Sequence, residues 1–270
     1  MPSLRIAAVQ TVSTPGVERN LDAARRLVAE AAGRGAELVV LPEYFCLMGR
    51  DDTDKLAIAE APGDGPIQRA LAGLARAHRV WLVGGTLPLR VPQRPDRVLN
   101  ACCVFGPDGR PAARYDKMHL FCYDNGRERY DEGRVLQAGD APVAFDAGGW
   151  RVGLSVCYDL RFPELYHALG RPPCDVIAVP SAFTYTTGRA HWELLLRARA
   201  VENQCYVVAP AQGGVHENGR RTWGHSMIVD PWGDVLGVLP EGEGVVVADV
   251  SRTRLAEVRT QLPALEHRRI

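Results

Sequence analysis

The sequence predicts a single α/β domain of mixed architecture. Two observations support this. Segments with helical spacing alternate with short apolar strands over the first two thirds of the chain, and the last third is rich in strands around a turn at residues 231–233. No change of composition and no Ser/Gly linker divides residues 1–270. One mixed domain over residues 1–270 is the simplest arrangement that buries all of these segments.

The first forty residues establish the alternation. Residues 4–10 have the composition of a strand. Residues 20–32 place apolar side chains at helical spacing, and the glycines that follow predict the end of this helix. Residues 37–41 form a short apolar run that ends at a proline. The order is therefore strand, helix, strand.

The same criteria predict the remaining elements. Helices are expected at residues 66–78, 163–169, 191–202 and 252–259. Residues 99–105 and 112–115 are expected to form a hairpin around Pro107-Asp108-Gly109. Further strands are expected at residues 80–86, 150–157, 176–180, 205–210, 226–229, 235–239 and 245–250.

Composition excludes several classes of protein. Hydrophobic residues make up 46% of the chain and the formal net charge is zero, which argues against nucleic acid or an anionic membrane as a partner. The seven cysteines contain no CxxC pair, so scattered thiols in a reducing compartment are expected. No signal peptide and no membrane-spanning run is recognisable. We therefore expect a soluble, cytoplasmic protein.

Cys157 is the first candidate for chemistry. It ends an apolar strand, and polar residues lead from it into a predicted helix. Open α/β sheets place their sites at such strand ends, where free backbone N–H groups of the turn stabilise an oxyanion. Taken alone, a cysteine in this position is more often a small buried hydrophobic residue than a catalytic one.

Glu43 and Lys117 are the second and third candidates. Glu43 directly follows a buried strand and a proline, so its carboxylate is placed to act as a general base. Lys117 follows a hairpin strand, where an ammonium near a thiol lowers the thiol pKa and donates to an oxyanion. A solvated loop acid and a surface lysine are the alternatives. Together the three residues supply a nucleophile, a base and a cationic donor without metal or cofactor.

Other chemistries are less well supported. Zinc requires clustered ligands, and the chain has no HxxxH or CxxC spacing. The sequence contains neither a GxGxxG or P-loop motif nor the GxSxG turn of a serine hydrolase. A papain-like pairing of cysteine with His119 or His225 remains open, although the local papain signature is absent.

Three ordered motifs resemble those of the nitrilase superfamily of carbon–nitrogen hydrolases over essentially the whole chain. They are residues 41–43, 115–120 and 157–164. The resemblance implies a four-layer α-β-β-α sandwich with mixed sheets, usually paired into homodimers or larger homo-oligomers. It implies Glu43 as general base, Lys117 as oxyanion donor and Cys157 as nucleophile.

The same resemblance suggests further site residues. A second glutamate follows the lysine in such families, and Glu132 is the candidate here, with a loop acid as the alternative. The backbone N–H of Tyr158 is expected to complete the oxyanion hole. At positions 116, 133 and 213 the family usually has other residues than Asp116, Gly133 and Gly213. These differences leave the three catalytic candidates unchanged but affect the prediction of the substrate.

Within the superfamily the chain looks most like the Nit branch, on residues 187–193, 196–206, 223–233 and 262–269. It resembles the deaminated glutathione amidases more than the ω-amidases, and residues 204–214 are the stretch that discriminates between them. The implied reaction is hydrolysis of the amide of a 2-oxo acid through a Cys thioester, with deaminated glutathione split to 2-oxoglutarate and cysteinylglycine. Arg161 is expected to clamp the 2-oxo acid, with Phe183 and Thr187 lining the pocket. The alternatives are an ω-amidase, an N-carbamoyl hydrolase, and a non-catalytic binding protein on the same fold.

Overall fold

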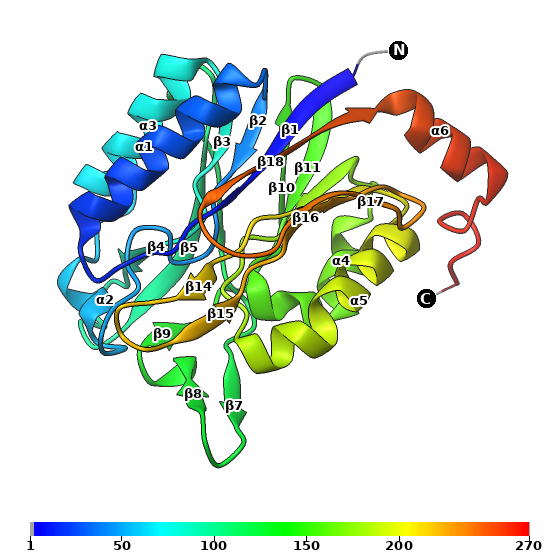
Figure 1. Ribbon diagram of the computed structural model, residues 1–270. Coiled ribbons are helices and arrows are strands. Elements are labelled where there is room, and N and C mark those ends of the chain that lie inside the picture. The colour runs from blue at the N-terminus through cyan, green and yellow to red at the C-terminus, as the bar shows by residue number, and fades with distance from the viewer. Residues whose placement is uncertain (1–2, 270) are drawn as a thin grey trace.

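The computed structural model describes residues 3–269 and contains two mixed β-sheets packed face to face, with helices on both outer sides (Figure 1). The eight-stranded sheet has the order β18-β1-β2-β3-β5-β4, with β6 and β9 also paired to β5. Its strands are β1 (Ser3–Gln10), β2 (Leu38–Val40), β3 (Trp81–Val83), β4 (Leu87–Arg90), β5 (Val98–Phe105), β6 (Pro111–Asp116), β9 (Leu136–Gln137) and β18 (Gly244–Ser251).

The second sheet has six strands in the order β10-β11-β12-β13-β16-β17. These are β10 (Val143–Ala147), β11 (Trp150–Leu154), β12 (Val176–Ala178), β13 (Tyr206–Ala209), β16 (Ser226–Val229) and β17 (Val235–Leu239). Each sheet has a parallel centre, β1-β2-β3 in one and β11-β12-β13 in the other. Parallel strands direct their carboxyl ends to the same edge, and this edge is where open α/β sheets carry their sites.

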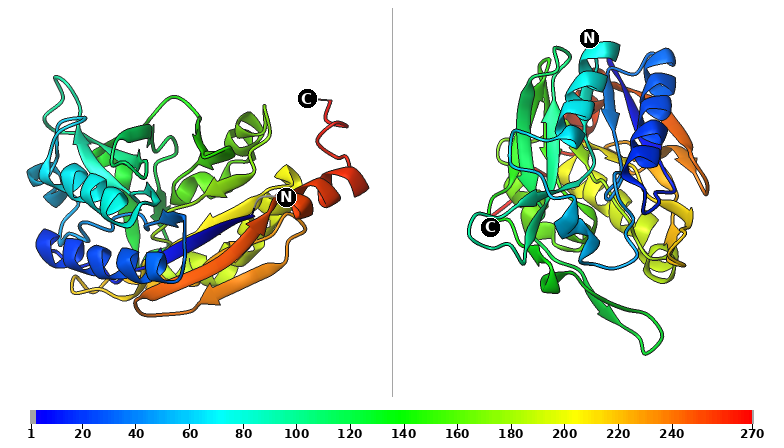
Figure 2. Two further views of the ribbon diagram at one scale, coloured as in Figure 1. Left: turned by 90° about the horizontal axis from the view of Figure 1, so that it is seen from above. Right: turned by 90° about the vertical axis from the view of Figure 1, so that its left-hand side faces the viewer.

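Helices form the two outer layers. The helices α1 (Val17–Gly33) and α3 (Pro66–His78) lie side by side on the outer face of the first sheet (Figures 1 and 2). The helices α4 (Pro163–Leu169) and α5 (Tyr185–Asn203) cover the second sheet. One apolar core lies between the sheets and extends beneath α5, and another lies beneath α1 and α3. The predicted α-β-β-α sandwich is therefore confirmed.

Smaller elements surround the edge where the parallel strands end. They are α2 (Asp54–Ala57), the 3-10 helices η1 (Glu132–Arg134) and η2 (Cys157–Arg161), and the two-stranded pairs β7 (Cys122–Asp124) with β8 (Arg129–Asp131) and β14 (Gly213–Val215) with β15 (Arg221–Trp223). The β7–β8 hairpin protrudes from the body of the molecule (Figures 1 and 2).

Two predicted boundaries move in the structure. The helix expected at residues 191–202 begins six residues earlier, because the Thr184 side chain accepts a hydrogen bond from the backbone N–H of Thr187 and caps it. The strand expected to reach Cys157 ends at Leu154, and Cys157 instead begins η2. Both changes lie beside the candidate nucleophile.

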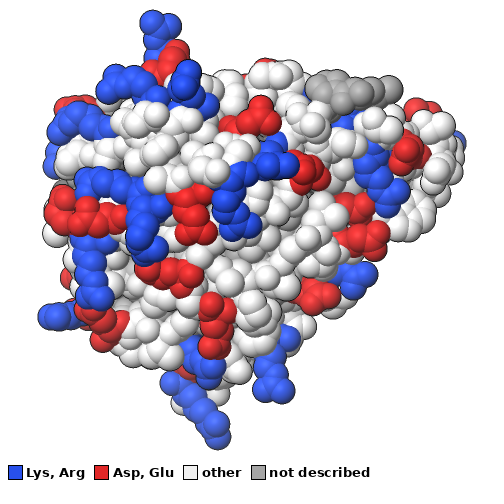
Figure 3. Space-filling model, turned by 45° about the horizontal axis from the view of Figure 1, so that its top comes forward, with Lys and Arg blue, Asp and Glu red and all other residues white. Residues whose placement is uncertain are grey.

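The β-rich last third is shared between the sheets. β16 and β17 extend the second sheet, whereas β18 crosses to the first sheet and pairs antiparallel with β1 along its full length. The helix α6 (Arg252–Gln261) follows and projects away from the sandwich (Figure 1). Within residues 3–269, no helix combines the length and apolarity required to cross a bilayer. Acidic and basic side chains are interspersed on the face seen in Figure 3.

Candidate active site

The candidate residues lie at corresponding ends of strands from the two sheets. Glu43 comes three residues after the end of β2, and Cys157 comes three residues after the end of β11. Lys117 directly follows β6, and Glu132 begins η1. Because the two sheets face each other, these separate chain segments meet at one edge of the sandwich.

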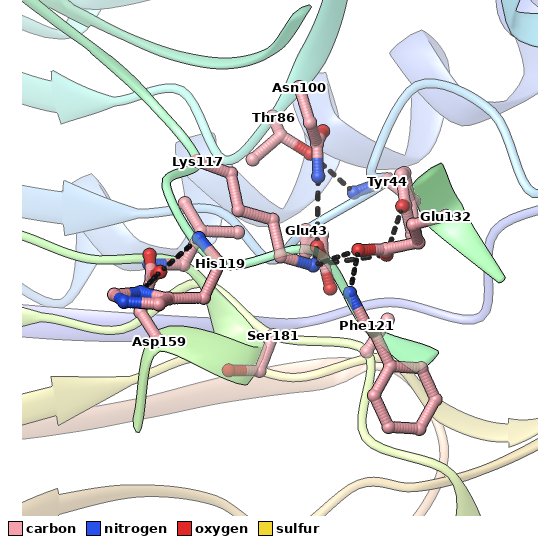
Figure 4. A network of polar contacts seen from close by, with 12 residues as sticks. Glu43, Tyr44, Thr86, Asn100, Lys117, His119, Phe121, Glu132, Asp159 and Ser181 are labelled. Carbon is pink, nitrogen blue, oxygen red and sulfur yellow. Dashed lines mark hydrogen bonds and ion pairs between the residues drawn. The ribbon is translucent and has the colours of Figure 1, made fainter. Parts of the chain in front are cut away.

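A buried charge cluster forms where they meet (Figure 4). The Lys117 Nζ atom lies 2.8 Å from Glu43 Oε1 and 2.8 Å and 3.0 Å from the two carboxylate oxygens of Glu132. The side chains of Lys117 and Glu43 are fully shielded from solvent. Two carboxylates therefore share one ammonium, and the cluster carries one excess negative charge when all three groups are ionised.

Neighbouring side chains hold both carboxylates in place. Asn100 Nδ2 donates to Glu43 Oε1 at 2.9 Å. The Tyr44 hydroxyl and the Phe121 backbone N–H each donate to Glu132, both at 2.7 Å. Charge-assisted hydrogen bonds of this kind fix orientation strongly in a buried site. Neither Asn100 nor Tyr44 belongs to the predicted site, because an ordinary strand asparagine and a tyrosine beside a motif give no separate signal in the sequence.

The backbone at Glu43 depends on a close approach by Gly85. A Cβ atom at Gly85 would lie 2.1 Å from the Pro42 carbonyl oxygen, and this glycine also has φ +59°. The next residue after Glu43 is strained as well, since Tyr44 has φ +57°. The loop therefore holds the carboxylate in one direction at a cost in local backbone energy.

Cys157 lies on a strained turn of the same kind. Its φ is +51°, a conformation that non-glycine residues rarely adopt. The Asp159 carboxylate stabilises the turn by accepting from the Val156 backbone N–H at 2.8 Å. A sharp strand-to-helix turn presents a nucleophile above the sheet and leaves first-turn N–H groups unpaired by the helix, among them that of Tyr158.

A small cavity opens above the thiol. Of the predicted site residues, it is lined by Glu43, Glu132, Cys157, Tyr158, Arg161, Phe183 and Thr187. Lys117 is not among the lining residues and lies beneath the two carboxylates that it bridges. The structure thus brings all eight predicted residues to one place. Seven of them line the cavity, and the Lys117 ammonium lies behind the two carboxylates.

The surroundings push the proton affinities of the two carboxyl groups apart. Burial raises the pKa of Glu43, and the Glu132 charge adds to this rise, while Lys117 opposes it. Burial also acts on Glu132, but the Lys117 ammonium and hydrogen bonds from Phe121 and Tyr44 outweigh it and lower its pKa. The two carboxyl groups therefore differ in proton affinity, with Glu43 the more easily protonated of the pair.

The expected effect of Lys117 on the thiol is outweighed. Burial and the Glu43 charge raise the pKa of Cys157 well above its ordinary value. Lys117 and a backbone hydrogen bond from Ala182 lower it, as an ammonium beside a thiol should, but do not reverse the direction. The expected lowering of the thiol pKa by Lys117 is therefore present but smaller than the rise caused by burial and by Glu43. The side chain of Cys157 hydrogen-bonds to Glu43, which is the group placed to take its proton.

Arg161 lies in the wall of the cavity among aromatic rings. Its guanidinium carbon is 5.3 Å from the Phe183 ring centroid and 5.8 Å from that of Tyr158, and Nη1 lies 3.1 Å from His191 Nδ1. Within residues 3–269 it forms no ion pair with an acidic side chain. Thr187, predicted to lie in a loop, instead occupies the first turn of α5. Its hydroxyl is 2.9 Å from that of Thr184.

The two histidines of the papain-like alternative face elsewhere. The His119 ring stacks on Phe162 at 3.8 Å and its Nδ1 lies 2.7 Å from Asp159. The His225 ring stacks on Trp223 at 4.0 Å. Neither ring lines the cavity above Cys157. Across the described residues, no group of three or more Cys, His, Asp or Glu side chains is arranged to hold a metal ion.

Four lining residues have no counterpart in the predicted site: Phe121, Ala182, Thr184 and Arg220, of which Arg220 alone carries a charge. Arg220, in the turn between β14 and β15, reaches the cavity and donates from Nη2 to the Ala182 carbonyl oxygen at 3.1 Å. In the sequence it stands beside Arg221 in a polar turn, so only the fold distinguishes the two arginines.

Comparison with known proteins agrees with this geometry. The family model described as carbon–nitrogen hydrolase matches residues 5–260. A deaminated glutathione amidase of Synechocystis sp. is 41% identical over 265 residues, which covers 97% of each chain. An omega-amidase of Homo sapiens is 37% identical over 271 residues, which covers all of this chain and 96% of the relative.

Among solved structures, the C. elegans NitFhit protein superposes with a TM-score of 0.92 at 38% identity. The match covers 99% of this chain, which spans 65% of the length of NitFhit. A family model over most of the chain and relatives of this similarity leave no doubt about descent. The chain belongs to the carbon–nitrogen hydrolase family, as the three motifs at residues 41–43, 115–120 and 157–164 predict.

Proposed function

We propose that this protein hydrolyses the amide of a 2-oxo acid through a thioester on Cys157, with deaminated glutathione as the favoured substrate. The products are 2-oxoglutarate and cysteinylglycine. The observation that supports this most directly is the convergence of a thiol, a carboxylate and an ammonium from three distant segments at one small cavity.

In the first half-reaction Glu43 removes the thiol proton and the sulfur attacks the amide carbon. The raised pKa of Glu43 suits this step, since it brings the carboxylate closer in basicity to the buried thiol. The oxyanion accepts hydrogen bonds from the Lys117 ammonium and the Tyr158 backbone N–H. Glu43 returns the proton to the nitrogen, the carbon–nitrogen bond breaks, and the amine leaves.

In the second half-reaction Glu43 takes a proton from water, and the resulting hydroxide attacks the thioester carbonyl. The carbon–sulfur bond breaks, the acid is released, and the proton returns to sulfur. Glu132 remains ionised throughout because Lys117, Phe121 and Tyr44 all stabilise its charge. Its role is to orient the Lys117 ammonium at the oxyanion, which makes Glu132 a positioning residue.

The substrate assignment has two supports. The relatives include proteins named deaminated glutathione amidase and omega-amidase, and both names describe enzymes that act on amides. In addition, the Arg161 guanidinium lies in the cavity wall without an acidic partner in residues 3–269, where it is placed to bind the carboxylate of a 2-oxo acid. Phe183 and Thr187 shape the same wall.

Omega-amidase activity on 2-oxoglutaramate is the second candidate, favoured by the human relative. N-carbamoyl hydrolysis is a third reaction open to the same nucleophile. Rates on deaminated glutathione, 2-oxoglutaramate and an N-carbamoyl amino acid, measured with one enzyme preparation, rank the three reactions directly.

The deciding test of the nucleophile is Cys157→Ala. We expect complete loss of amide hydrolysis with an unchanged unfolding midpoint, because the side chain lines the cavity and the substitution removes only its sulfur atom. Cys122→Ala is the matched control, since this thiol is exposed on the β7–β8 hairpin and its removal leaves the rate unchanged. Wild-type turnover by Cys157→Ala would overturn the mechanism.

Arg161→Lys tests the acid-binding role. A lysine keeps the charge but loses the planar fork, so we expect a higher KM for the 2-oxo acid amide with a smaller change in kcat. An unchanged KM would remove Arg161 from substrate binding.

Three coarser expectations remain part of the proposal. The chain acts as one domain over residues 1–270, works in the cytoplasm, and forms a homodimer or larger homo-oligomer. Exposed apolar side chains on α5, Leu194 and Val201, support self-association. Light scattering after size-exclusion chromatography measures the mass, and a monomer at micromolar concentration contradicts the last expectation.

A further inference from the structure

Arg220 lies at the boundary between two spaces. It lines the cavity above Cys157 and also an adjoining open groove. Its guanidinium carbon is 4.9 Å from the centroid of the Tyr130 ring, which lines the groove. Glu132 in the cavity and Tyr44 in the groove are hydrogen-bonded to each other at 2.7 Å. The groove is therefore separated from the reacting atoms by a single layer of side chains.

The charge of Arg220 is not neutralised. In the described part of the chain it makes no ion pair with an aspartate or glutamate, and its buried Nε atom has no hydrogen-bond partner. The neighbouring Arg221 differs in both respects: it pairs with Glu241 at 3.1 Å and stacks 3.7 Å from the ring of Tyr185. An anionic group that reaches Arg220 gains a charge with no acidic partner among the described residues, and the unpartnered Nε shows that the hydrogen bonds of this guanidinium are incomplete.

The groove favours anions overall. Besides Arg220 its lining includes three basic side chains, Arg50, Lys55 and Arg129, and two acidic ones, Asp51 and Asp52. Lys55 and Arg129 are engaged with aspartates at 3.3 Å and 3.8 Å. Of the basic side chains that line the groove, Arg50 and Arg220 make no ion pair with an acidic side chain of residues 3–269.

The chemistry decides which half of the substrate lies there. The acyl group becomes bonded to the sulfur of Cys157 and must remain in the enclosed cavity until water releases it. The amine must leave before that water enters, so its path runs toward an open space. Because Arg220 is shared by the cavity and the open groove, it lies along this path.

We infer that Arg220 binds a carboxylate on the leaving amine, and that the groove beside it is a subsite for an amino acid or short peptide released by the reaction. The inference rests on the proposed function and narrows its substrate class to amides between a 2-oxo acid and an amine that carries a free carboxylate. A primary amide, whose leaving group is ammonia, makes no use of this subsite.

The test compares two substrates that differ only at the far carboxylate: deaminated glutathione and its C-terminal amide. We expect wild-type kcat/KM to favour the free acid by about 10- to 100-fold, the effect of one charge-assisted hydrogen-bonded pair. Arg220→Gln should remove most of this preference by raising KM for the free acid, while the C-terminal amide changes less than about threefold. Arg220→Lys should retain part of the preference, because the charge remains. Arg221→Gln is the control and should preserve it.

The outcomes separate the two proposals. If wild-type enzyme hydrolyses both substrates equally well, or if Arg220→Gln slows both by the same factor, the leaving-group subsite is overturned and the proposed function stands. If wild-type enzyme hydrolyses neither of them nor 2-oxoglutaramate, the proposed function falls and this inference with it. If Arg220→Gln does not fold, Arg220→Lys provides the test. The ratio of kcat/KM for the free acid to kcat/KM for the C-terminal amide is then compared between this variant and wild type. A wild-type ratio near one, or an equal ratio in Arg220→Lys, would exclude two-point binding of the carboxylate by the Arg220 guanidinium.

Discussion

Two buried acidic clusters lie next to each other at the site, and they behave differently (Figure 4). Asp159 accepts four hydrogen bonds: from the Tyr115 hydroxyl at 2.7 Å, the Val156 N–H at 2.8 Å, and the backbone N–H and ring Nδ1 of His119 at 3.0 Å and 2.7 Å. It does not line the cavity. Glu43, in contrast, lines the cavity and shares one ammonium with a second carboxylate.

The comparison separates a structural acid from a reactive one. Both carboxylates are buried, so burial does not distinguish them. Asp159 has its hydrogen-bonding capacity filled by groups of three neighbouring segments and holds the Cys157 turn in place. Glu43 has a raised pKa, an excess of negative charge beside it and a thiol within hydrogen-bonding reach. Unsaturated capacity that faces a cavity is what marks the reactive group.

The largest expected effect comes from Glu43→Gln. The amide keeps an oxygen for Asn100 and Lys117 but no longer accepts the thiol proton, so kcat/KM should fall by about 10²- to 10⁴-fold, the usual contribution of a general base. Thermal unfolding should change little. Glu60→Gln is the matched control. This buried glutamate accepts hydrogen bonds from the backbone N–H groups of Ile67 and Gln68 at the start of α3 and does not line the cavity above the thiol. It should cost stability while preserving the rate.

The next effect is on folding and concerns Asp159→Ala. The substitution leaves the Tyr115 hydroxyl and two backbone N–H groups without acceptors, and we expect the free energy of unfolding to fall by about 3 kcal/mol. Urea denaturation measures it. Asp146→Ala is the control, because this exposed side chain accepts only from the Gly149 N–H at 2.8 Å in a turn. Equal losses for the two variants would contradict the role of Asp159 as the anchor of the Cys157 turn.

The pH profile sharpens the comparison further. Glu43 must be ionised to act, and its pKa is raised, so kcat/KM should fall on acidification at a pH above the ordinary glutamate value of 4.5. Glu132→Gln removes a negative charge that raises this pKa, so the midpoint of the acidic limb should move to lower pH in that variant. A midpoint that stays in place, or moves upward, contradicts the assignment of this limb to Glu43.

The smallest effect is expected for Tyr44→Phe. The variant loses one hydrogen bond to Glu132, which is worth about 1 kcal/mol and corresponds to roughly a fivefold loss of kcat/KM through a less firmly oriented Lys117. Tyr123→Phe is the control, since its hydroxyl contacts only the exposed Asn125 in the β7–β8 hairpin. A loss as large as that of Glu43→Gln would indicate direct participation of the Tyr44 hydroxyl.

Much of the fold follows from local pattern. The helix α3 has the predicted bounds at Pro66–His78, because a proline favours its first turn and apolar residues recur along one face. The first turns of α5 could not be predicted from the apolar pattern, because residues 185–190 are mostly polar and the start of the helix depends on the Thr184 cap. Strands of three residues, such as β14 and β15, carry too little periodicity to be recognised.

The site divides in the same way. Glu43, Lys117 and Cys157 stand within three residues of strand ends and inside ordered motifs, so their residue types and positions are readable along the chain. The role of Arg220 cannot be recognised from the sequence, because Arg220 and Arg221 are adjacent in one polar segment and differ only in the groups that each guanidinium contacts. One meets Glu241 and Tyr185, and the other meets the cavity.

The sequence alone determined the family, the alternation of helices and strands, and the identity of the nucleophile candidate with its two charged companions. Tertiary structure alone decided the direction in which the pKa of that nucleophile moves. Burial and the charges of Glu43, Lys117 and Glu132, which come from separate chain segments, act on the Cys157 thiol together, and their net effect is opposite to that of the lysine alone. Electrostatic energies depend on distance and solvent exclusion, and neither is defined until the two sheets have packed.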